Sequence, residues 1–160
     1  MRDDQYQIIP LLEPADYQSA GSDLDSINMG RLHRVQIAIQ LGAVTGDNPI
    51  VKVYAGASAG TKTTELSFKY RVSGADSGAT GADVFGSRTS ITAGGSGAAL
   101  GAATAIDHRT FLIDLDSGEM PDGKEWLTVE VDDGSASVLF MSALAIAWPR
   151  YDGDTHLTAV

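Results

Sequence analysis

Cysteine is missing from all 160 residues of the chain. Its absence excludes disulfide bonds, thiolate metal sites and cysteine nucleophiles together. Basic residues are also scarce, with 11 Lys and Arg against 21 Asp and Glu and a formal net charge of −10. The densest basic cluster, Arg31, His33 and Arg34, has the position of residues that flank a strand. Because so acidic a chain repels phosphate backbones, we expect no direct binding to nucleic acid.

Long apolar runs are missing too, and so is a convincing amphipathic helix. The longest apolar run, residues 138–148, is interrupted only by Ser142. It is too short to span a bilayer as a helix, so we expect no membrane protein. The first seven residues are polar and acidic, which is not the pattern of a secretory signal.

What the chain contains instead is alternation of apolar and polar side chains with a period of two. This pattern is typical of half-buried strands, and it recurs in five runs. The side chains expected to face the core are Val35, Ile37, Ile39, Leu41, Val51, Val53, Leu66, Phe68, Tyr70, Val72, Phe111, Ile113, Leu115, Leu127, Val129 and Val131. Trp126, Thr128 and Glu130 are expected to face outward. Residues 138–148 are apolar on both faces, which predicts a central strand.

Turns rich in glycine and aspartate separate these runs, at residues 46–49, 57–60, 121–123 and 132–134. Seven or eight strands joined by short turns predict an all-β fold, an antiparallel β-sandwich in a jelly-roll arrangement. We place the sandwich domain at residues 31–151 and a C-terminal tail at residues 152–160.

The first 30 residues mix apolar side chains with turn-forming and acidic ones. Two interpretations stay open: an edge segment of the sandwich, for which Pro10 argues, or an extended N-terminal arm that binds a neighbouring subunit. Such an arm would reach roughly 100 Å when fully extended. Its partner-binding residues would be its apolar and aromatic side chains, Tyr6, Ile8, Ile9, Leu11, Leu12 and Tyr17.

Residues 73–105 do not fit the alternating pattern. They contain eight Gly and nine Ala, and their large apolar side chains are Val84, Phe85, Ile91 and Leu100. A loop of this length without structure of its own is unusual inside a compact domain. It either includes one more strand, near residues 89–92, or is a long Gly/Ala-rich loop that another subunit orders.

The stretch VYAGASAGTKTTEL, residues 53–66, resembles a phosphate-binding loop in composition but not in spacing. A P-loop requires G-x-x-x-x-G-K-[ST], so that consecutive amides surround the phosphates before the Lys. Here Gly56 and Gly60 are four residues apart, and Thr61 precedes Lys62. The residues after Thr63 alternate as a strand, whereas a P-loop leads into a helix. We therefore predict a glycine-rich hairpin turn.

Other motifs for chemistry are not expected either. The three His residues are isolated, without H-x-x-x-H or H-x-E spacing, so we predict no zinc site. Aspartate pairs such as Asp114 and Asp116 lack the remaining oxygen ligands of a calcium loop. We expect no nucleophile elbow, although a Ser-His-Asp triad can form from residues distant in sequence. The prediction is a protein that is not an enzyme, with no catalytic residues, cofactor or metal.

Five segments carry a resemblance to a known family. They are DSINMG at residues 25–30, VYAGASAGTKTTELSFKYR at 53–71, GADVFG at 81–86, DGKEWLTVEV at 122–131 and PRY at 149–151. In this order, over residues 24–151, they resemble the small β-rich virion proteins of tailed bacteriophages, some of which are capsid decoration (cement) proteins. That family has no catalytic residues to carry over.

The resemblance implies a virion structural protein on the capsid exterior, made in the bacterial host cytoplasm. Its partner would be the major capsid protein, which it would bind as a homo-oligomer, a trimer, that bridges capsid subunits. The alternative is a glycan-binding sandwich module of a phage tail or fibre, with Tyr54, Trp126 or Tyr151 as exposed stacking platforms. A hydrolase with an unrecognised set of residues is the third hypothesis.

Overall fold

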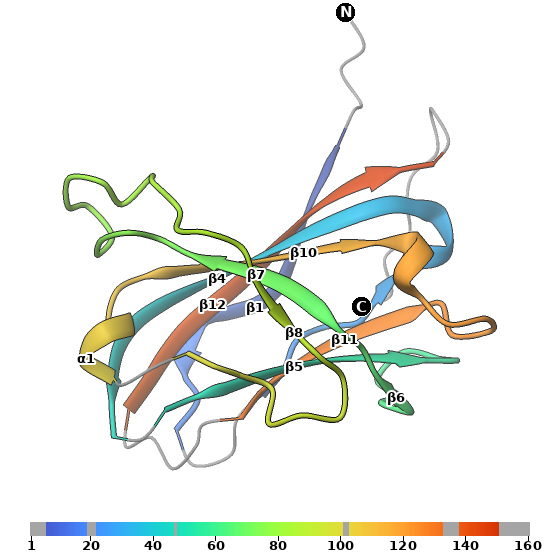
Figure 1. Ribbon diagram of the computed structural model, residues 1–160, viewed down its shortest axis with the longest axis horizontal. Helices are drawn as coiled ribbons and strands as arrows, with labels where there is room; N and C mark the ends of the chain where they lie inside the picture. Colours follow the sequence, from blue (N-terminus) through green and yellow to red (C-terminus); the bar gives the residue numbers. More distant parts are fainter. Residues whose placement is uncertain (1–5, 19–21, 47, 101–102, 133–137, 151–160) are drawn as a thin grey trace, which may run out of the picture.

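The computed structural model describes residues 6–18, 22–46, 48–100, 103–132 and 138–150, which form a sandwich of two antiparallel sheets (Figure 1). Sheet A contains, in spatial order, β1 (Gln7–Asp16), β12 (Val138–Pro149), β4 (Leu32–Thr45), β10 (Thr110–Asp116), β7 (Phe68–Val72) and β8 (Thr89–Ile91). Sheet B contains β2 (Ser22–Asp23), β3 (Ile27–Asn28), β11 (Trp126–Asp132), β5 (Ile50–Gly56), β6 (Thr64–Glu65) and β9 (Ala98–Ala99). The helical elements are the short α1 (Ala103–Ile106) and the 3₁₀ turns η1 (Met29–Arg31) and η2 (Ser117–Glu119).

The strand pairing is that of a jelly roll. β1 pairs with β12, β2 and β3 pair with β11, β4 pairs with β10, and β5 pairs with β6. The chain is therefore folded like one long hairpin, with the glycine-rich turn between β5 and β6 at its tip. The hairpin is wrapped so that β1, β4, β10 and β12 lie in sheet A, whereas β2, β3, β5, β6 and β11 lie in sheet B, which is the strand arrangement of a jelly roll. The fold predicted from the alternating pattern is confirmed.

The core contains nearly all of the alternating side chains that the sequence indicates. Of the sixteen predicted inward-facing residues, fourteen are buried, and Tyr70 and Val72 are half-buried against the core. The ring of Tyr70 stacks on that of Phe111, with 4.5 Å between centroids. The prediction for Thr128 was wrong, because this side chain is buried. The loop around Ser26 covers it, and the two hydroxyl oxygens are 2.7 Å apart.

The N-terminal segment is part of both sheets, so the sandwich begins at residue 7 rather than at residue 31. β1 is an edge strand of sheet A, so of the two interpretations left open for the N-terminal segment, the edge segment is the one that the structure has. Two register shifts in its pairing with β12, around Leu12, interrupt the period of two. Because of these bulges, Leu11 is buried and the adjacent Leu12 also packs against the core. The same bulges made the strand hard to recognise in the sequence.

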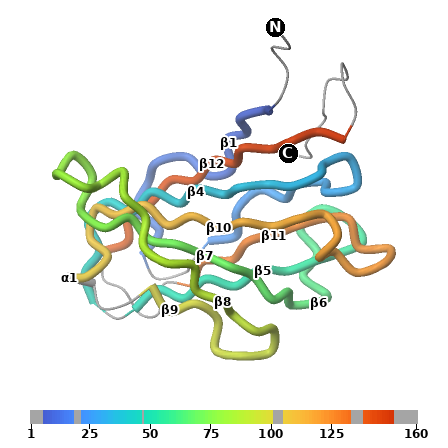
Figure 2. The backbone as a smooth tube through the Cα atoms, turned by 45° about the horizontal axis from the view of Figure 1, so that its top comes forward, coloured from blue at the N-terminus to red at the C-terminus, as the bar shows by residue number. Residues whose placement is uncertain are grey.

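Residues 73–100 contain two short strands, so of the two interpretations left open for the Gly/Ala-rich region, the one with a further strand near residues 89–92 is confirmed by β8. The excursion 74–88 between β7 and β8 projects beyond one end of the sandwich (Figures 1 and 2). Gly97, at a φ of +80°, brings the chain back to sheet B before β9. A Cβ atom there would lie 2.7 Å from the Ile50 side chain, so the close approach requires glycine. The predicted C-terminal tail, 152–160, lies outside the described residues.

Candidate interaction surface

The glycine-rich stretch is a hairpin and not a phosphate loop. β5 continues through the turn into strand β6, with Ala55 opposite Thr64, and no helix follows. Gly56 allows the turn to close, because a Cβ atom at this position would lie 2.0 Å from Thr61 Oγ1. The predicted hairpin is confirmed.

The same stretch also contains a motif that sequence reasoning missed. Residues 56–60 read GASAG, which matches the G-x-S-x-G pattern of a nucleophile elbow. An elbow places its Ser on a strand-to-helix turn, whereas Ser58 lies in an exposed strand-to-strand turn. Its backbone carbonyl accepts a hydrogen bond from Thr61 Oγ1 at 2.6 Å, and the described residues give its hydroxyl no histidine partner. The pattern is present, but its required structural context is not.

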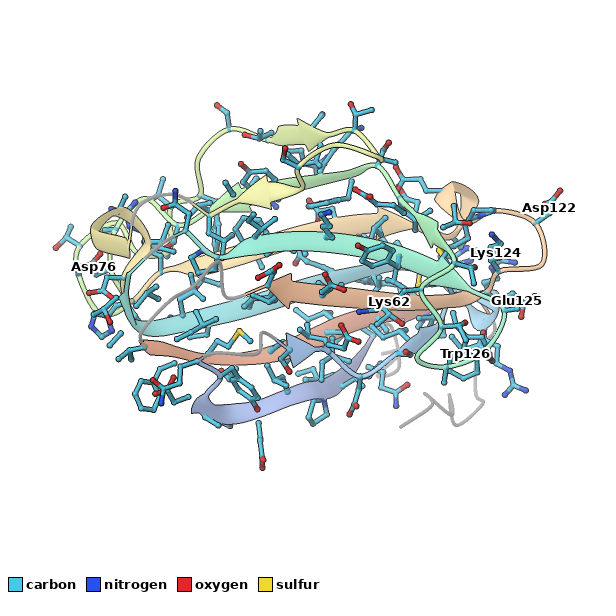
Figure 3. All side chains as sticks on the ribbon, turned by 90° about the horizontal axis from the view of Figure 1, so that it is seen from below. Lys62, Asp76, Asp122, Lys124, Glu125 and Trp126 are labelled. Atoms are coloured by element: carbon cyan, nitrogen blue, oxygen red, sulfur yellow. The ribbon has the colours of Figure 1, made fainter. Side chains whose placement is uncertain are left out.

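Lys62, the residue in the place of a P-loop lysine, is held over sheet B by two carboxylates (Figure 3). Its Nζ donates to Asp23 Oδ1 at 2.9 Å and to Glu130 Oε2, and it lies 5.7 Å from the Tyr54 ring centroid. Burial lowers the pKa of Lys62, but the hydrogen bonds and charges of the two carboxylates outweigh this effect and raise it above its usual value. Lys62 therefore ties the hairpin to the outer face of sheet B.

Two buried or partly buried polar contacts reinforce this arrangement. The Gly60 amide donates to Ser26 Oγ at 2.8 Å, and Ser26 is in turn hydrogen-bonded to Thr128 on β11. The chain's own hairpin thus covers part of the outer face of sheet B, and internal hydrogen bonds satisfy the polar groups there.

Potential metal-ligating side chains do not cluster among the described residues. They contain no group of three or more His, Cys, Asp or Glu side chains that could hold an ion. They also contain no helix long and apolar enough to cross a membrane.

A shallow hollow of about 180 Å³ lies at one end of the sandwich, between residues 117–125 and Arg150. Figure 3 shows Lys124 and Glu125 at this end, with Asp76 at the opposite end. Lys124 donates to Thr64 Oγ1, and Arg150 donates to the Leu32 carbonyl and to Ser117 Oγ. Because both cations already have internal partners, this hollow is a weak candidate for a ligand site.

The outer face of sheet A differs, because large apolar side chains are exposed there. Strand register places Ile8 opposite Ile146 and Pro10 opposite Leu144 across β1 and β12. Phe140 and Leu144 are 47% and 41% exposed, and Ile8 is 58% exposed. We call this surface the apolar strip; it comprises Tyr6, Ile8, Pro10, Phe140, Leu144, Ile146 and Trp148. Apolar side chains gathered in this way on an exposed sheet face are typical of a protein–protein contact.

The predicted partner-binding residues divide into three pairs. Tyr6 and Ile8 are exposed and belong to the apolar strip. Ile9 and Leu11 are buried in the chain's own core, each 3% exposed, so their assignment to a partner contact is corrected. Leu12 and Tyr17 are half-buried against that core, and the Tyr17 hydroxyl donates to the Glu13 carbonyl at 2.9 Å.

Sequence reasoning did not identify the strip residues on β12 as a binding surface, although the two apolar faces of this strand were visible in the sequence. Residues 138–148 are apolar on both faces, which predicted a central strand, and β12 does pair with β1 and β4. Its inner side chains Leu139 and Met141 are buried, whereas Phe140 and Leu144 face outward and are exposed. The second apolar face of the strand therefore marks a surface rather than a buried layer.

A charged region adjoins the strip on the same face. The guanidinium of Arg34 on β4 stacks over the Trp148 ring, with 4.0 Å between its central carbon and the ring centroid. Asp114 on β10 accepts a hydrogen bond from Gln36 at 2.7 Å and lies 3.1 Å from Arg88 and 3.8 Å from Arg71. Except for Arg71, these side chains line a hollow of about 130 Å³.

The alternative of glycan stacking depends on three aromatic residues. Tyr54 and Trp126 are both half-buried, and Tyr151 lies outside the described residues. Burial and the Glu130 charge raise the pKa of the Tyr54 hydroxyl. Among the described residues, all exposed large apolar side chains except Val84 belong to the apolar strip.

Comparison with known proteins finds no matching family model, no matching curated protein and no matching solved structure.

Proposed function

We propose that the chain is a structural protein of a tailed-phage virion that binds the outside of the assembled capsid and stabilises it. The partner is the major capsid protein, and the bound chain, as a trimer, bridges neighbouring capsid subunits. The observation that carries the proposal is the exposed apolar strip on sheet A. The resemblance of residues 24–151 to phage virion proteins supplies the identity of the partner.

The fold supports a function in binding another protein through a sheet face. The jelly roll presents a broad sheet face, and its glycine-rich motifs are turns rather than sites for phosphate or a nucleophile. Burying the apolar strip would supply about 25 cal/mol for each Å² of apolar surface removed from water. A standard interface buries about 1,600 Å² in total, to which a six-stranded sheet face can contribute substantially.

The stabilising effect follows from linkage. A protein that binds the assembled shell but not its dissociated subunits adds its binding free energy to the stability of the shell. Because each copy bridges several subunits, loosening one capsomer breaks contacts with several bound copies. The overall charge of −10 suits a protein outside the shell, where it has no need to contact DNA.

The direct test uses preformed shells of the proposed partner, a major capsid protein of a tailed phage. We expect the purified chain to co-sediment with expanded shells, at a fixed number of copies per capsid subunit, and to raise their thermal disruption temperature. The variant Leu144→Ser should bind less well, whereas Val84→Ser, an exposed apolar residue outside the strip, should bind like the wild type. Absence of saturable binding by the wild type would refute the proposed function.

A further inference from the structure

We propose that Arg34, stacked on Trp148, is the polar anchor of the sheet A face and binds a carboxylate of the partner. The partner surface would then carry an Asp or Glu side chain beside aliphatic groups that cover the apolar strip. The inference rests on the proposed function only for the identity of the partner. Its chemistry is argued from the face itself.

The geometry of Arg34 leaves its hydrogen-bonding edge unused. Its guanidinium lies on the Trp148 ring, and the described residues give it no ion pair or hydrogen bond. Asp116 is its cross-strand neighbour on β10, yet the two side chains do not form an ion pair. Stacking holds the guanidinium plane in one orientation while its N–H groups remain free, which suits bidentate binding of a carboxylate.

The other arginines on this face, and Arg109 near it, lie close to carboxylates of the chain itself. Arg71 and Arg88 both approach Asp114, and Arg109 lies 3.6 Å from Asp76. Arg31 has no recorded ion pair among the described residues, but no aromatic ring supports it either. Arg71 also lies near an aromatic ring, 5.7 Å from the Phe85 centroid, but it faces Asp114 at 3.8 Å. Among the described arginines, Arg34 therefore combines an aromatic support with the absence of a carboxylate partner.

The charge balance of the face favours an acidic partner. Its outward side chains include four cations, Arg34, Lys69, Arg71 and Arg88, and three carboxylates, Asp114 and Asp116 on β10 and Asp16 at the β1 edge, opposite Phe140. This local excess of positive charge stands out on a chain whose net charge is −10. A carboxylate that approaches this face is attracted locally, whereas a nucleic acid meets the repulsion of the whole chain.

Arg34 lies directly beside the apolar strip. Trp148 belongs to both the apolar strip and the charged hollow, so a ligand group held by Arg34 lies beside the strip. Trp and Arg are enriched in the residues that dominate binding energy at protein interfaces. The partner that fits both the apolar strip and the charged hollow is a protein surface with aliphatic side chains and one carboxylate directed at Arg34.

The first experiment compares Arg34→Gln with Arg31→Gln in binding to the shells. Both changes remove one positive charge, and the two residues are three positions apart. We expect Arg34→Gln to raise Kd about 10- to 100-fold and Arg31→Gln to change it less than about threefold. Equal losses for both variants would mean that general electrostatic attraction suffices, and the proposal would be wrong.

Two further variants test the geometry rather than the charge. Arg34→Lys keeps the cation but loses the planar fork, so it should not restore wild-type affinity. Trp148→Leu removes the ring that supports Arg34 and should weaken shell binding to a similar extent. Full binding by Arg34→Lys would overturn the bidentate contact. Circular dichroism and urea unfolding show whether each variant is folded.

A second experiment does not depend on shells. N-acetylglutamate is titrated into ¹⁵N-labelled protein while the Trp148 indole N–H and Arg34 Nε–H resonances are followed by NMR. We expect saturable shifts with a Kd of about 10 mM, lost in Arg34→Gln and kept in Arg31→Gln. No saturable shift would overturn the carboxylate site even if shells bind. Saturable shifts in a protein that binds no shells would instead refute the proposed function alone.

Self-association is the remaining alternative occupant. If sedimentation shows an oligomer that both Leu144→Ser and Arg34→Gln dissociate, a second copy of the chain covers this face. That result would overturn the proposal of an acidic partner. An oligomer that both variants leave intact agrees with it, because assembly then uses another surface.

Discussion

The outer faces of the two sheets use their side chains in opposite ways. On sheet B, Lys62, Ser26 and Gly60 bring the chain's own hairpin down onto the strands and satisfy its polar groups internally. On sheet A, the apolar strip and Arg34 have few such internal partners. The first face contributes to folding, and the second is left available for contact with another molecule. Substitutions on the two faces should therefore affect different measurements.

The largest effect is expected where the hairpin closes on sheet B. In Gly56→Ala the new Cβ would lie 2.1 Å from the Thr61 carbonyl oxygen, so the backbone must move. We expect the free energy of unfolding to fall by about 3 kcal/mol. Urea denaturation measures it, with Gly118→Ala as the control, since no atom lies within 4 Å of a Cβ at that position. Equal stability of the two variants would contradict the described hairpin.

The next effect concerns the buried hydroxyl pair under the hairpin. Thr128→Val keeps the shape of the side chain but leaves the Ser26 hydroxyl without its partner at 2.7 Å. We expect a loss of about 1.5 kcal/mol in the free energy of unfolding. The same substitution at Thr89, which is exposed in β8, should change stability by less than about 0.5 kcal/mol.

A smaller effect that depends on pH is expected at Lys62. Lys62→Met should cost about 1 kcal/mol at neutral pH, because it removes the ion pairs with Asp23 and Glu130. The folded-state pKa of Lys62 is raised above its usual 10.5, so its contribution is fully present below that pH and is lost as pH rises further. Urea unfolding of both proteins at neutral pH and above pH 10.5 checks this sign. A stability difference that grows with pH would contradict it.

The smallest effect on stability is expected on the apolar strip. Leu144→Ser and Ile8→Ser alter side chains that are 41% and 58% exposed, so each should change the free energy of unfolding by less than about 0.5 kcal/mol. Both should nevertheless weaken partner binding. A large loss of stability in either variant would show that the strip serves the fold instead, and the distinction between the two faces would fail.

Much of the fold could be predicted because strand periodicity is a local property of the sequence. The alternation of Val35 to Leu41 and of Phe111 to Leu115 identified two strands and their inner faces directly. What local pattern does not contain is the path of the chain between strands. The bulges near Leu12 and the two-residue strands β2 and β3 depend on pairing with distant residues, so the sequence did not reveal them.

The candidate surface was harder to predict than the fold. An apolar side chain such as Leu144 looks the same in sequence whether a buried layer or another molecule covers it. Thr128 is the opposite case, a polar residue that was predicted to be exposed but is buried. A distant loop covers it and supplies its hydrogen bond. Arg34 was recognised as a strand-flanking cation, but its stacking on Trp148 joins residues 114 positions apart.

The most direct test of the account is hydroxyl-radical footprinting of the chain, free and bound to shells of the major capsid protein. Side chains on the two faces are compared within the same sample. The account predicts that Ile8, Phe140, Leu144 and Trp148 on sheet A become protected on binding, while Tyr54 on sheet B keeps its reactivity. Protection of Tyr54 with unchanged labelling of Phe140 and Leu144 would contradict it.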